Sequence, residues 1–216
     1  MPTRFRDRKE AGQTLAHRLE QYAGRSDVIV LALPRGGVPV AAEVARALGA
    51  PLDVFLVRKL GVPGQEELAM GAIAENGIRV LNEDVFPCIA VSPAALEAVT
   101  ARERHELERR SHLYRGGRSL VDVRGRTVIL VDDGLATGTT MQAAVAALRE
   151  LEPAAIVVAV PVASSAACSL FTNRYADVSC VCLHTPEPFE AVGLWYEDFN
   201  QTTDDEVRAL LVTQRR

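Results

Sequence analysis

The sequence predicts an α/β fold, with a mainly parallel, doubly wound sheet of about five strands. Short apolar runs that contain β-branched residues alternate along the chain with segments whose apolar side chains recur at helical spacing. The runs are largely apolar throughout, as is typical of strands that are buried on both faces. Strands of this kind, alternating with helices, favour a parallel sheet that helices cover on both sides.

The first quarter of the chain is expected to form a helix, a strand, a second helix and a second strand. Residues 7–23 and 38–48 carry apolar side chains at helical spacing, and Gly49 ends the second of these helices. The runs VIVLAL at 28–33 and LDVFLV at 52–57 are short and rich in apolar and β-branched residues. Both runs are therefore predicted to be strands.

The middle of the chain is expected to carry an insertion. The segment 58–67 contains two glycines and a proline and is predicted to be a loop, whereas Asn76-Gly77 between two apolar segments predicts a hairpin. Residues 93–113 are predicted to be helical, and 102–126 hold eight arginines. A solvated helix face with ion pairs is the favoured interpretation, and an arginine stripe that faces a phosphate is the alternative.

The last part of the chain returns to alternating elements. Strands are predicted at 127–132, 154–161 and 177–183, with one helix after the loop that ends the first strand and another at 164–174. The segment from Thr203 to Glu206 is a capping box, so a final helix is expected to begin there.

Composition bears on location and partners. The net charge of -4 gives no reason to expect nonspecific binding to nucleic acid or to an anionic membrane. No apolar run approaches the roughly 20 residues of a transmembrane helix, and the charged start does not resemble a secretory signal. A cytoplasmic protein is therefore expected. The four cysteines, of which only Cys180 and Cys182 are close in sequence, are predicted to be buried, reduced thiols.

The stretch VDDGLATGTT at 131–140 has an unusual pattern. Asp132 and Asp133 are adjacent like charges at the end of an apolar run, and only small residues follow them. Such acids can accept hydrogen bonds from a vicinal diol or lie near Mg²⁺. Gly138 lets the backbone approach a phosphate, and N–H groups at the start of the next helix can point at it. The loop is neither a Walker A motif nor a dinucleotide fingerprint, because the required lysine and glycine spacing are absent.

Two other predicted strand ends carry cations beside glycine. They are LPRGG at 33–37 and VRKLG at 57–61. In open α/β sheets, ligands bind beyond the carboxyl ends of the strands. The three strand ends together suggest a polyanionic ligand that also carries hydroxyls or a metal.

These motifs resemble those of a known family. VILVDDGLATGTT resembles the phosphoribosyl pyrophosphate signature of type I phosphoribosyltransferases. LPRGGVPVA resembles the family's pyrophosphate-binding turn, and VRKLG resembles the basic motif before its mobile catalytic loop. The resemblance implies a transferase that uses Mg²⁺ and displaces pyrophosphate at ribose C1, mainly by positioning and by stabilising the leaving group. It implies one domain, with a core at about 28–183, an insertion at about 60–120 and a hood at about 184–216.

The resemblance also implies roles for the matching residues. Asp132 and Asp133 would bind the ribose 2- and 3-hydroxyls, directly or through Mg²⁺, and would be catalytic together with Arg58 and Lys59. Residues 60–67 would close over the site to exclude water. The 5-phosphate would be bound by Ala136, Thr137, Gly138, Thr139 and Thr140. The pyrophosphate would be bound by the backbone of Arg35, Gly36 and Gly37 and by the charges of Arg58 and Lys59.

Two positions depart from the family pattern. Ala136 stands where the 6-oxopurine enzymes of the family carry an aspartate that acts on N7 of the base. A 6-oxopurine acceptor is therefore disfavoured, and no general base is visible in the loop. Gly134 stands where the family has an apolar residue, and a looser turn is expected there.

The acceptor pocket is expected in the hood. Phe189, Trp195 and Tyr196 are candidates for stacking on a nucleobase-like acceptor. For each of them, an aromatic cluster that packs the hood on the core is the alternative. The helix at 93–113 could form a lid, part of the hood or a subunit contact, and the family resemblance implies a homodimer.

Two functions compete on this sequence. The first is a phosphoribosyltransferase of nucleotide metabolism, whose partners are phosphoribosyl pyrophosphate and a small-molecule acceptor, with no nucleic acid and no membrane. The second is a non-catalytic regulatory protein that senses phosphoribosyl pyrophosphate on the same fold. Arg58, Lys59 and the expected mobile loop favour the enzyme, because a sensor needs affinity but no closed reaction site. A phosphorylation receiver domain is disfavoured, because receivers place such acids after their first strand.

Overall fold

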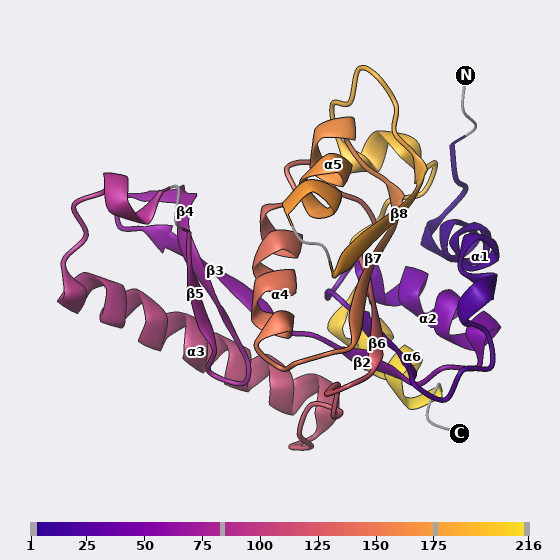
Figure 1. The fold of residues 1–216 in the computed structure, drawn as a ribbon, viewed down its shortest axis with the longest axis horizontal. Helices are drawn as coiled ribbons and strands as arrows, with labels where there is room; N and C mark the ends of the chain where they lie inside the picture. Colours follow the sequence, from indigo (N-terminus) through magenta and orange to yellow (C-terminus); the bar gives the residue numbers. More distant parts are fainter. Residues whose placement is uncertain (1–3, 83–84, 175–176, 214–216) are drawn as a thin grey trace.

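The computed structural model confirms the predicted α/β architecture (Figure 1). It describes residues 4–82, 85–174 and 177–213, so the last residues of the predicted hood lie outside the described part. A five-stranded sheet in the order β2-β1-β6-β7-β8 is parallel throughout. Its strands are β1 (Val28–Ala32), β2 (Leu52–Val54), β6 (Thr127–Val131), β7 (Ala155–Val162) and β8 (Val178–His184).

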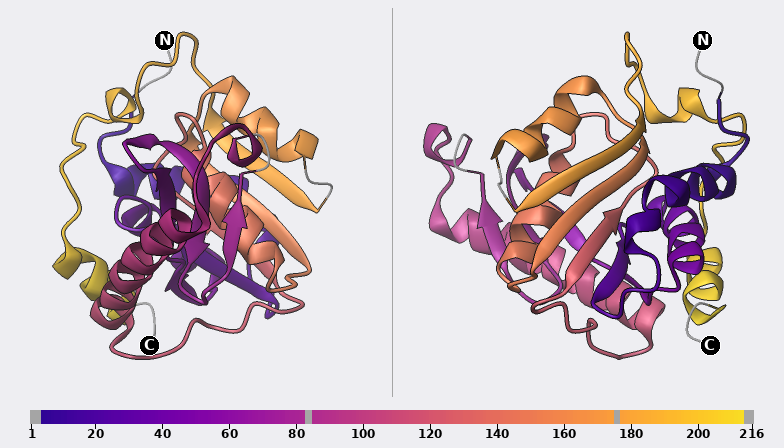
Figure 2. Two further views of the ribbon diagram at one scale, coloured as in Figure 1. Left: turned by 90° about the vertical axis from the view of Figure 1, so that its left-hand side faces the viewer. Right: turned by 45° about the vertical axis from the view of Figure 1, so that its right-hand side comes forward.

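Helices cover both faces of this sheet (Figures 1 and 2). Side chains of β1 alternate between the two layers, with Val28 and Val30 on the side of α1 and α2, and Ile29 and Leu31 on the side of α4 and α5. This explains why the strand is apolar at every position. The helices of the core are α1 (Arg8–Arg18), α2 (Gly37–Leu48), α4 (Thr139–Arg149) and α5 (Ser165–Arg174).

The remaining helical segments flank this core. The C-terminal α6 (Asp204–Thr213) begins at the predicted capping box, in which Glu206 accepts the Thr203 N–H at 2.7 Å. Short 3-10 turns are η1 (Glu20–Tyr22), η2 (Phe86–Cys88) and η3 (Val192–Trp195). No helix in the described ranges is long and apolar enough to cross a membrane.

A second, three-stranded sheet and the long helix α3 (Pro93–Arg115) project from one side of the core (Figure 1). The strands β3 (Val57–Val62), β4 (Gln65–Ala74) and β5 (Arg79–Leu81) are antiparallel. The predicted hairpin at Asn76-Gly77 joins β4 to β5, with Gly77 at a φ of 82°. The insertion expected between the core strands is therefore present as a sheet and a helix.

The prediction of a loop at 58–67 is wrong. β3 and β4 run through this segment as a second hairpin, and Gly64 turns the chain at a φ of 81°. Gly61 lies at a register shift of the ladder, where a Cβ atom would lie 2.6 Å from the carbonyl oxygen of Glu66. The glycines that suggested a loop therefore serve a bulged hairpin. The predicted strand at 52–57 is also divided, because β2 ends at Val54 and β3 begins in the other sheet.

A buried ion cluster fastens α3 to the core. The side chain of Arg115 is 1% exposed, and its Nε donates to Asp53 Oδ1 at 2.9 Å. Its Nη2 donates to Glu75 Oε1 at 2.8 Å, and its Nη1 also contacts the Glu75 carboxylate. Asp53 belongs to β2, and Glu75 follows β4. One guanidinium therefore joins the last turn of α3 to both sheets.

The hood packs on the turn that follows β6. The Leu135 N–H donates to Val162 O at 2.9 Å, which fastens this turn to β7. A Cβ atom on Gly134 would lie 2.6 and 2.9 Å from the two Cγ atoms of Val192 in the hood. In place of the looser turn that was expected, Gly134 makes room for the hood.

Loss of Arg115 should destabilise the protein strongly. Arg115→Met keeps much of the side-chain volume but leaves two buried carboxylates without a counter-charge, so the free energy of unfolding in urea should fall by about 3–5 kcal/mol. Arg124→Met is the control, because Arg124 and its partner Glu152 are 72% and 66% exposed. Equal urea midpoints for the two variants would contradict the anchoring role of Arg115.

Gly134→Ala should displace the hood. The added methyl group overlaps Val192, so the variant should lose about 1–3 kcal/mol of stability and show altered fluorescence of Trp195, the single tryptophan. Val192→Ala in the same chain removes both overlapping Cγ atoms and should restore the spectrum, and Val192→Ala alone is the control. A double variant that stays as perturbed as Gly134→Ala would rule out this contact as the cause.

Candidate functional site

Most of the predicted donor-site residues lie at the carboxyl ends of β1 and β6, whereas Arg58 and Lys59 lie on β3 of the second sheet. The strands β1 and β6 are parallel neighbours, and the chain leaves them in opposite directions, through α2 to β2 and through α4 to β7. This is the topological switch point of the sheet, where ligands bind in open α/β folds. The Leu33 N–H donates to Val131 O at 2.9 Å, so the strand ends stay paired until the two loops begin.

The acid pair is partly buried and held in place. Asp132 Oδ1 accepts the backbone N–H of Asp133 at 2.9 Å. Asp133 Oδ2 accepts from Nε of Arg8 at 2.8 Å and lies 2.8 Å from Nη2 of the same guanidinium. Burial, and then the charge of Asp133, raise the pKa of Asp132. Burial also raises the pKa of Asp133, and Arg8 opposes that rise. A ligand that donates hydrogen bonds, or a cation, would stabilise the charged form of both acids.

The turn after β1 lies in close contact with the acid pair. The space that a side chain at Gly36 would need is filled by the carboxylate of Asp133, and a Cβ atom on Gly37 would lie 2.7 Å from Val131 O. Glycine is therefore required at both positions by close approach. The Gly37 N–H donates to Leu33 O at 3.1 Å. This N–H group, which was predicted to bind pyrophosphate, is therefore already hydrogen-bonded within the turn.

The small-residue loop forms the start of α4. Gly138 adopts a left-handed conformation with a φ of 72°, and Thr139 is the first helical residue. The other loop residues, Ala136, Thr137, Thr139 and Thr140, are exposed. The hydroxyls of Thr137 and Thr139 lie 3.1 Å apart. An anion at this place would meet hydroxyl groups and the N–H groups of a helix N-terminus.

Acids from the accessory helices hold the two predicted arginines. Arg58 on β3 donates from Nε to Glu103 Oε2 of α3 at 2.8 Å. Nη1 of Arg35, whose peptide bond with Pro34 is cis, lies 3.8 Å from Asp204 Oδ1 at the start of α6. Lys59 follows Arg58 on β3, so the two side chains leave the strand on opposite faces.

A cavity of about 20 Å³ lies between the turn after β1, the start of α4, β3 and α3. It is lined by Pro34 after β1, by Thr140 in the first turn of α4, by Arg58 of β3 and by Arg110 of α3, among others. Arg109 and Arg110 both pair with Glu106, and their hydrogen bonds lower the pKa of Glu106 to about 2. The favoured interpretation of residues 93–113, a helix face with ion pairs, therefore agrees with the contacts of Arg109 and Arg110. Arg110 also lines the cavity at the candidate site.

The three acceptor candidates lie in the hood and take part in its packing. Tyr196 is 3% exposed, and its hydroxyl donates to Asp133 O at 2.6 Å. Phe189 and Trp195 pack against the small buried cluster that contains the Tyr196 ring. For Tyr196 the structure favours the packing alternative. Phe199, which no sequence pattern singled out, is 37% exposed and stacks on Tyr196 with ring centroids 5.0 Å apart.

Arg8 is the site residue that sequence reasoning missed. It is the first residue of α1, and its side chain is 12% exposed between the acid pair and the hood. One signal could have found it. A cation in the first turn of a helix opposes the helix dipole, so its presence there indicates an acidic partner elsewhere.

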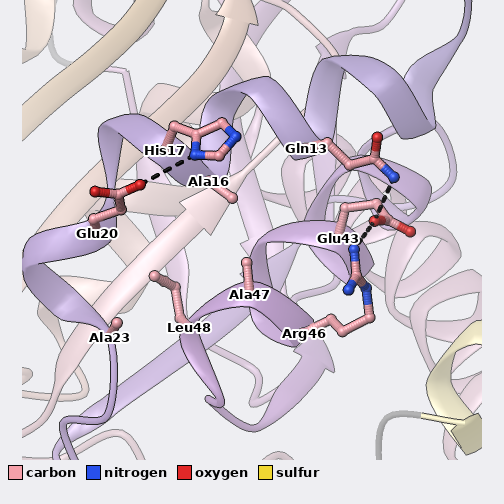
Figure 3. Close-up of a pocket in the computed structure, with 9 residues that line it drawn as sticks. All are labelled: Gln13, Ala16, His17, Glu20, Ala23, Glu43, Arg46, Ala47 and Leu48. Carbon is pink, nitrogen blue, oxygen red and sulfur yellow. Dashed lines mark hydrogen bonds and ion pairs between the residues drawn. The ribbon is translucent and has the colours of Figure 1, made fainter.

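A cavity of about 430 Å³ lies away from these residues, along α1 and α2 (Figure 3). Gln13 Nε2 and Arg46 Nη2 both donate to Glu43 Oε2 in its wall, at 3.0 and 2.6 Å. No predicted site residue lines this cavity. Cavity volume alone therefore does not mark the predicted site residues.

The cysteines are free, as predicted, but their burial differs from the prediction. Cys88 is exposed and the other three are half-buried. Cys168 of α5 comes close to β8, with its Sγ atom 2.8 Å from that of Cys180. Within the described ranges, no group of three or more His, Cys, Asp or Glu side chains is placed to hold a metal ion.

Comparisons with known proteins agree with the motifs. The model of the phosphoribosyl transferase domain matches residues 5–196. A Mycobacterium tuberculosis protein provisionally named a phosphoribosyl transferase is 51% identical over 207 residues, which are 96% of this chain and 46% of that protein. The chain thus spans less than half of the length of this curated relative.

Solved structures extend the similarity to the fold. The crystal structure of a Thermus thermophilus protein matches with a TM-score of 0.87 and 45% identity, over 98% of this chain and 99% of that one. An Aquifex aeolicus protein matches with a TM-score of 0.54 and 11% identity over 95% of this chain and 86% of that one, which shows likeness of fold alone. The family match includes α1, the switch-point loops and the hood as far as Tyr196. The chain belongs to the type I phosphoribosyltransferase family.

Proposed function

We propose that the chain transfers a phosphoribosyl group from phosphoribosyl pyrophosphate to a nitrogenous acceptor and releases pyrophosphate. One observation carries the proposal. An acid pair, a helix N-terminus with threonines and a glycine turn beside arginines meet at the β1–β6 switch point. The three features complement the three parts of the donor, which are the ribose diol, the 5-phosphate and the pyrophosphate.

Each part of the donor has its own partners in this proposal. Asp132 and Asp133 accept hydrogen bonds from the ribose hydroxyls, and the loop 136–140 binds the 5-phosphate. The backbone of Arg35 and Gly36 faces the pyrophosphate, whereas Gly37 serves the close approach of the two loops. Fixing both ends of the donor aligns ribose C1 for displacement, which is the main contribution that positioning makes to such a reaction.

The leaving group is stabilised by charge. Arg58 and Lys59 start the β3–β4 hairpin, and Arg58 exchanges its contact with Glu103 for the pyrophosphate when the donor binds. The hairpin tip within 60–67 closes over the site and excludes water. The paired backbone of the hairpin fixes Arg58 on one face of β3 and Lys59 on the other, which an unstructured loop would not do.

Mg²⁺ fits this site as a partner of the donor. Carboxylate oxygens are suitable ligands, but Arg8 already occupies Oδ2 of Asp133. The chain therefore offers few oxygens, which suits an ion held largely through the donor and water, with Asp132 and Asp133 nearby. When bound, Mg²⁺ neutralises charge on the pyrophosphate.

The acceptor is proposed to be a nucleobase-like compound other than a 6-oxopurine, because Ala136 supplies no group to act on N7. The hood at the acid pair is the proposed acceptor side. The cytoplasmic location and the homodimer stay predictions.

The acid pair and a pyrophosphate-release screen test this function together. With Mg²⁺ and phosphoribosyl pyrophosphate, a panel of purines, pyrimidines, pyridine carboxylates and amines should contain an acceptor that supports release. Asp132→Asn with Asp133→Asn should abolish donor binding in calorimetry, and Asp177→Asn, an exposed acid paired with Arg149, should not. Donor binding without release from any acceptor would favour the sensor. Unchanged donor affinity in the double variant would exclude the diol role.

Lys59→Ala should separate catalysis from binding. If the ammonium group stabilises the departing pyrophosphate, turnover should fall by about 100-fold while affinity for ribose 5-phosphate stays near the wild-type value. Lys9→Ala is the control, since Lys9 is the only other lysine of the chain and is exposed on α1. A turnover number equal to that of the control would remove Lys59 from the catalytic residues.

A further inference from the structure

The guanidinium of Arg8 is fully engaged at the joint between the acid pair and the hood. Its Nε donates to Asp133 Oδ2 at 2.8 Å, its Nη2 lies 2.8 Å from the same oxygen as an ion pair, and its Nη1 donates to Asn200 O at 2.7 Å. Its central carbon lies 3.9 Å from the ring centroid of Phe199, within the range of a cation–π contact. One side chain thus touches the ribose-binding acid and two residues of the hood.

These contacts exceed what is needed to attach α1 to the core. Leu15 and Leu19, farther along this helical segment, are already fully buried, and Phe5 pairs with Tyr196 in a parallel bridge that brings the start of α1 beside the hood (Figure 2). The charge of Arg8 is also unfavourable for its own helix, because it stands at the N-terminus. Its placement is favourable for Asp133 and for the hood, and this points to a role in the site.

The acid pair explains what Arg8 supplies. Two adjacent carboxylates repel each other, and both are partly shielded from water. The guanidinium compensates one of the two charges and fixes the direction of the Asp133 carboxylate, which lies against Gly36 of the pyrophosphate turn. Asp132 receives its fixed hydrogen bond from backbone instead. The two acids are therefore held by different means.

We infer that Arg8 is a positioning residue of the donor site, which orients Asp133 toward the ribose diol and fastens the hood segment 196–200 to that acid. The inference rests on the proposed function, because Asp133 needs orienting only if a ligand binds there. Arg8 acts through Asp133 and does not itself contact the reacting atoms. Its effect on donor affinity must therefore disappear when Asp133 can no longer pair with it.

A double-mutant cycle tests this dependence, with phosphoribosyl pyrophosphate and Mg²⁺ as the probe in calorimetry. Arg8→Ala should weaken donor binding by about tenfold or more in the wild-type background. In the Asp133→Asn background the same change should alter affinity by less than about twofold, because the ion pair is already broken. In the Asp132→Asn background the tenfold loss should persist, since that variant keeps the pair.

Two further variants separate positioning from folding. Arg8→Lys keeps the charge but loses the fork of donors, so it should recover only part of the donor affinity. Arg46→Ala is the control, because Arg46 pairs with Glu43 away from the acids and should bind the donor as the wild type does. If Arg8→Ala fails to fold, the cycle is run with Arg8→Lys, whose loss of affinity should again vanish in the Asp133→Asn background.

The outcomes distinguish this inference from the proposed function. Losses from Arg8 and Asp133 variants that add independently, or an Arg8→Ala variant that binds like Arg46→Ala, would overturn the positioning role while leaving the proposed function standing. A wild-type protein that does not bind phosphoribosyl pyrophosphate would overturn the proposed function, and the inference with it.

Discussion

The candidate site depends on how closely the loops after β1 and β6 approach each other. The strands are hydrogen-bonded neighbours, and the carboxylate of Asp133 fills the space that a side chain at position 36 would occupy. Gly36 has a φ of -59°, so any residue could adopt its backbone conformation. Contact, and not conformation, is what requires glycine there. A larger residue would have to displace the Asp133 carboxylate from the start of α2.

Ion pairs join the accessory elements to this core. Apolar contacts build the layers around the five-stranded sheet, but α3 and the start of α1 are each fixed by a charged pair that is at least partly buried, and the hood is tied to one of these pairs through Asn200 O. Arg115 ties α3 to both sheets, and Arg8 ties α1 and the hood to Asp133. Such pairs contribute little net stability compared with apolar packing, because both charges lose water. They are directional, however, so they fix the positions of charged side chains at the candidate site even where they add little stability.

The sequence predicted those parts of the fold that depend on local pattern. Continuous apolar runs marked the core strands, the capping box at Thr203 marked α6, and adjacent acids before small residues marked the switch point. Prediction failed where residues distant in sequence decide the structure. The glycines of 58–67 are compatible with a loop, and only the pairing of β3 with β4 makes them a bulged hairpin. Likewise, nothing near Gly134 in sequence reveals that Val192 occupies its side-chain space.

The hood and the donor site form one unit because the hood is fastened to the acid turn itself. Tyr196 donates to the backbone of Asp133, Val192 fills the space beside Gly134, and Asn200 accepts from the arginine that holds the Asp133 carboxylate. All three contacts converge on two consecutive residues. The hood therefore has little freedom to shift without moving Asp133, so the position of this acid and the shape of the adjoining hood are set together. The aromatic residues at this joint take part in the packing of the hood, so aromatic content alone does not separate a packing role from contact with an acceptor.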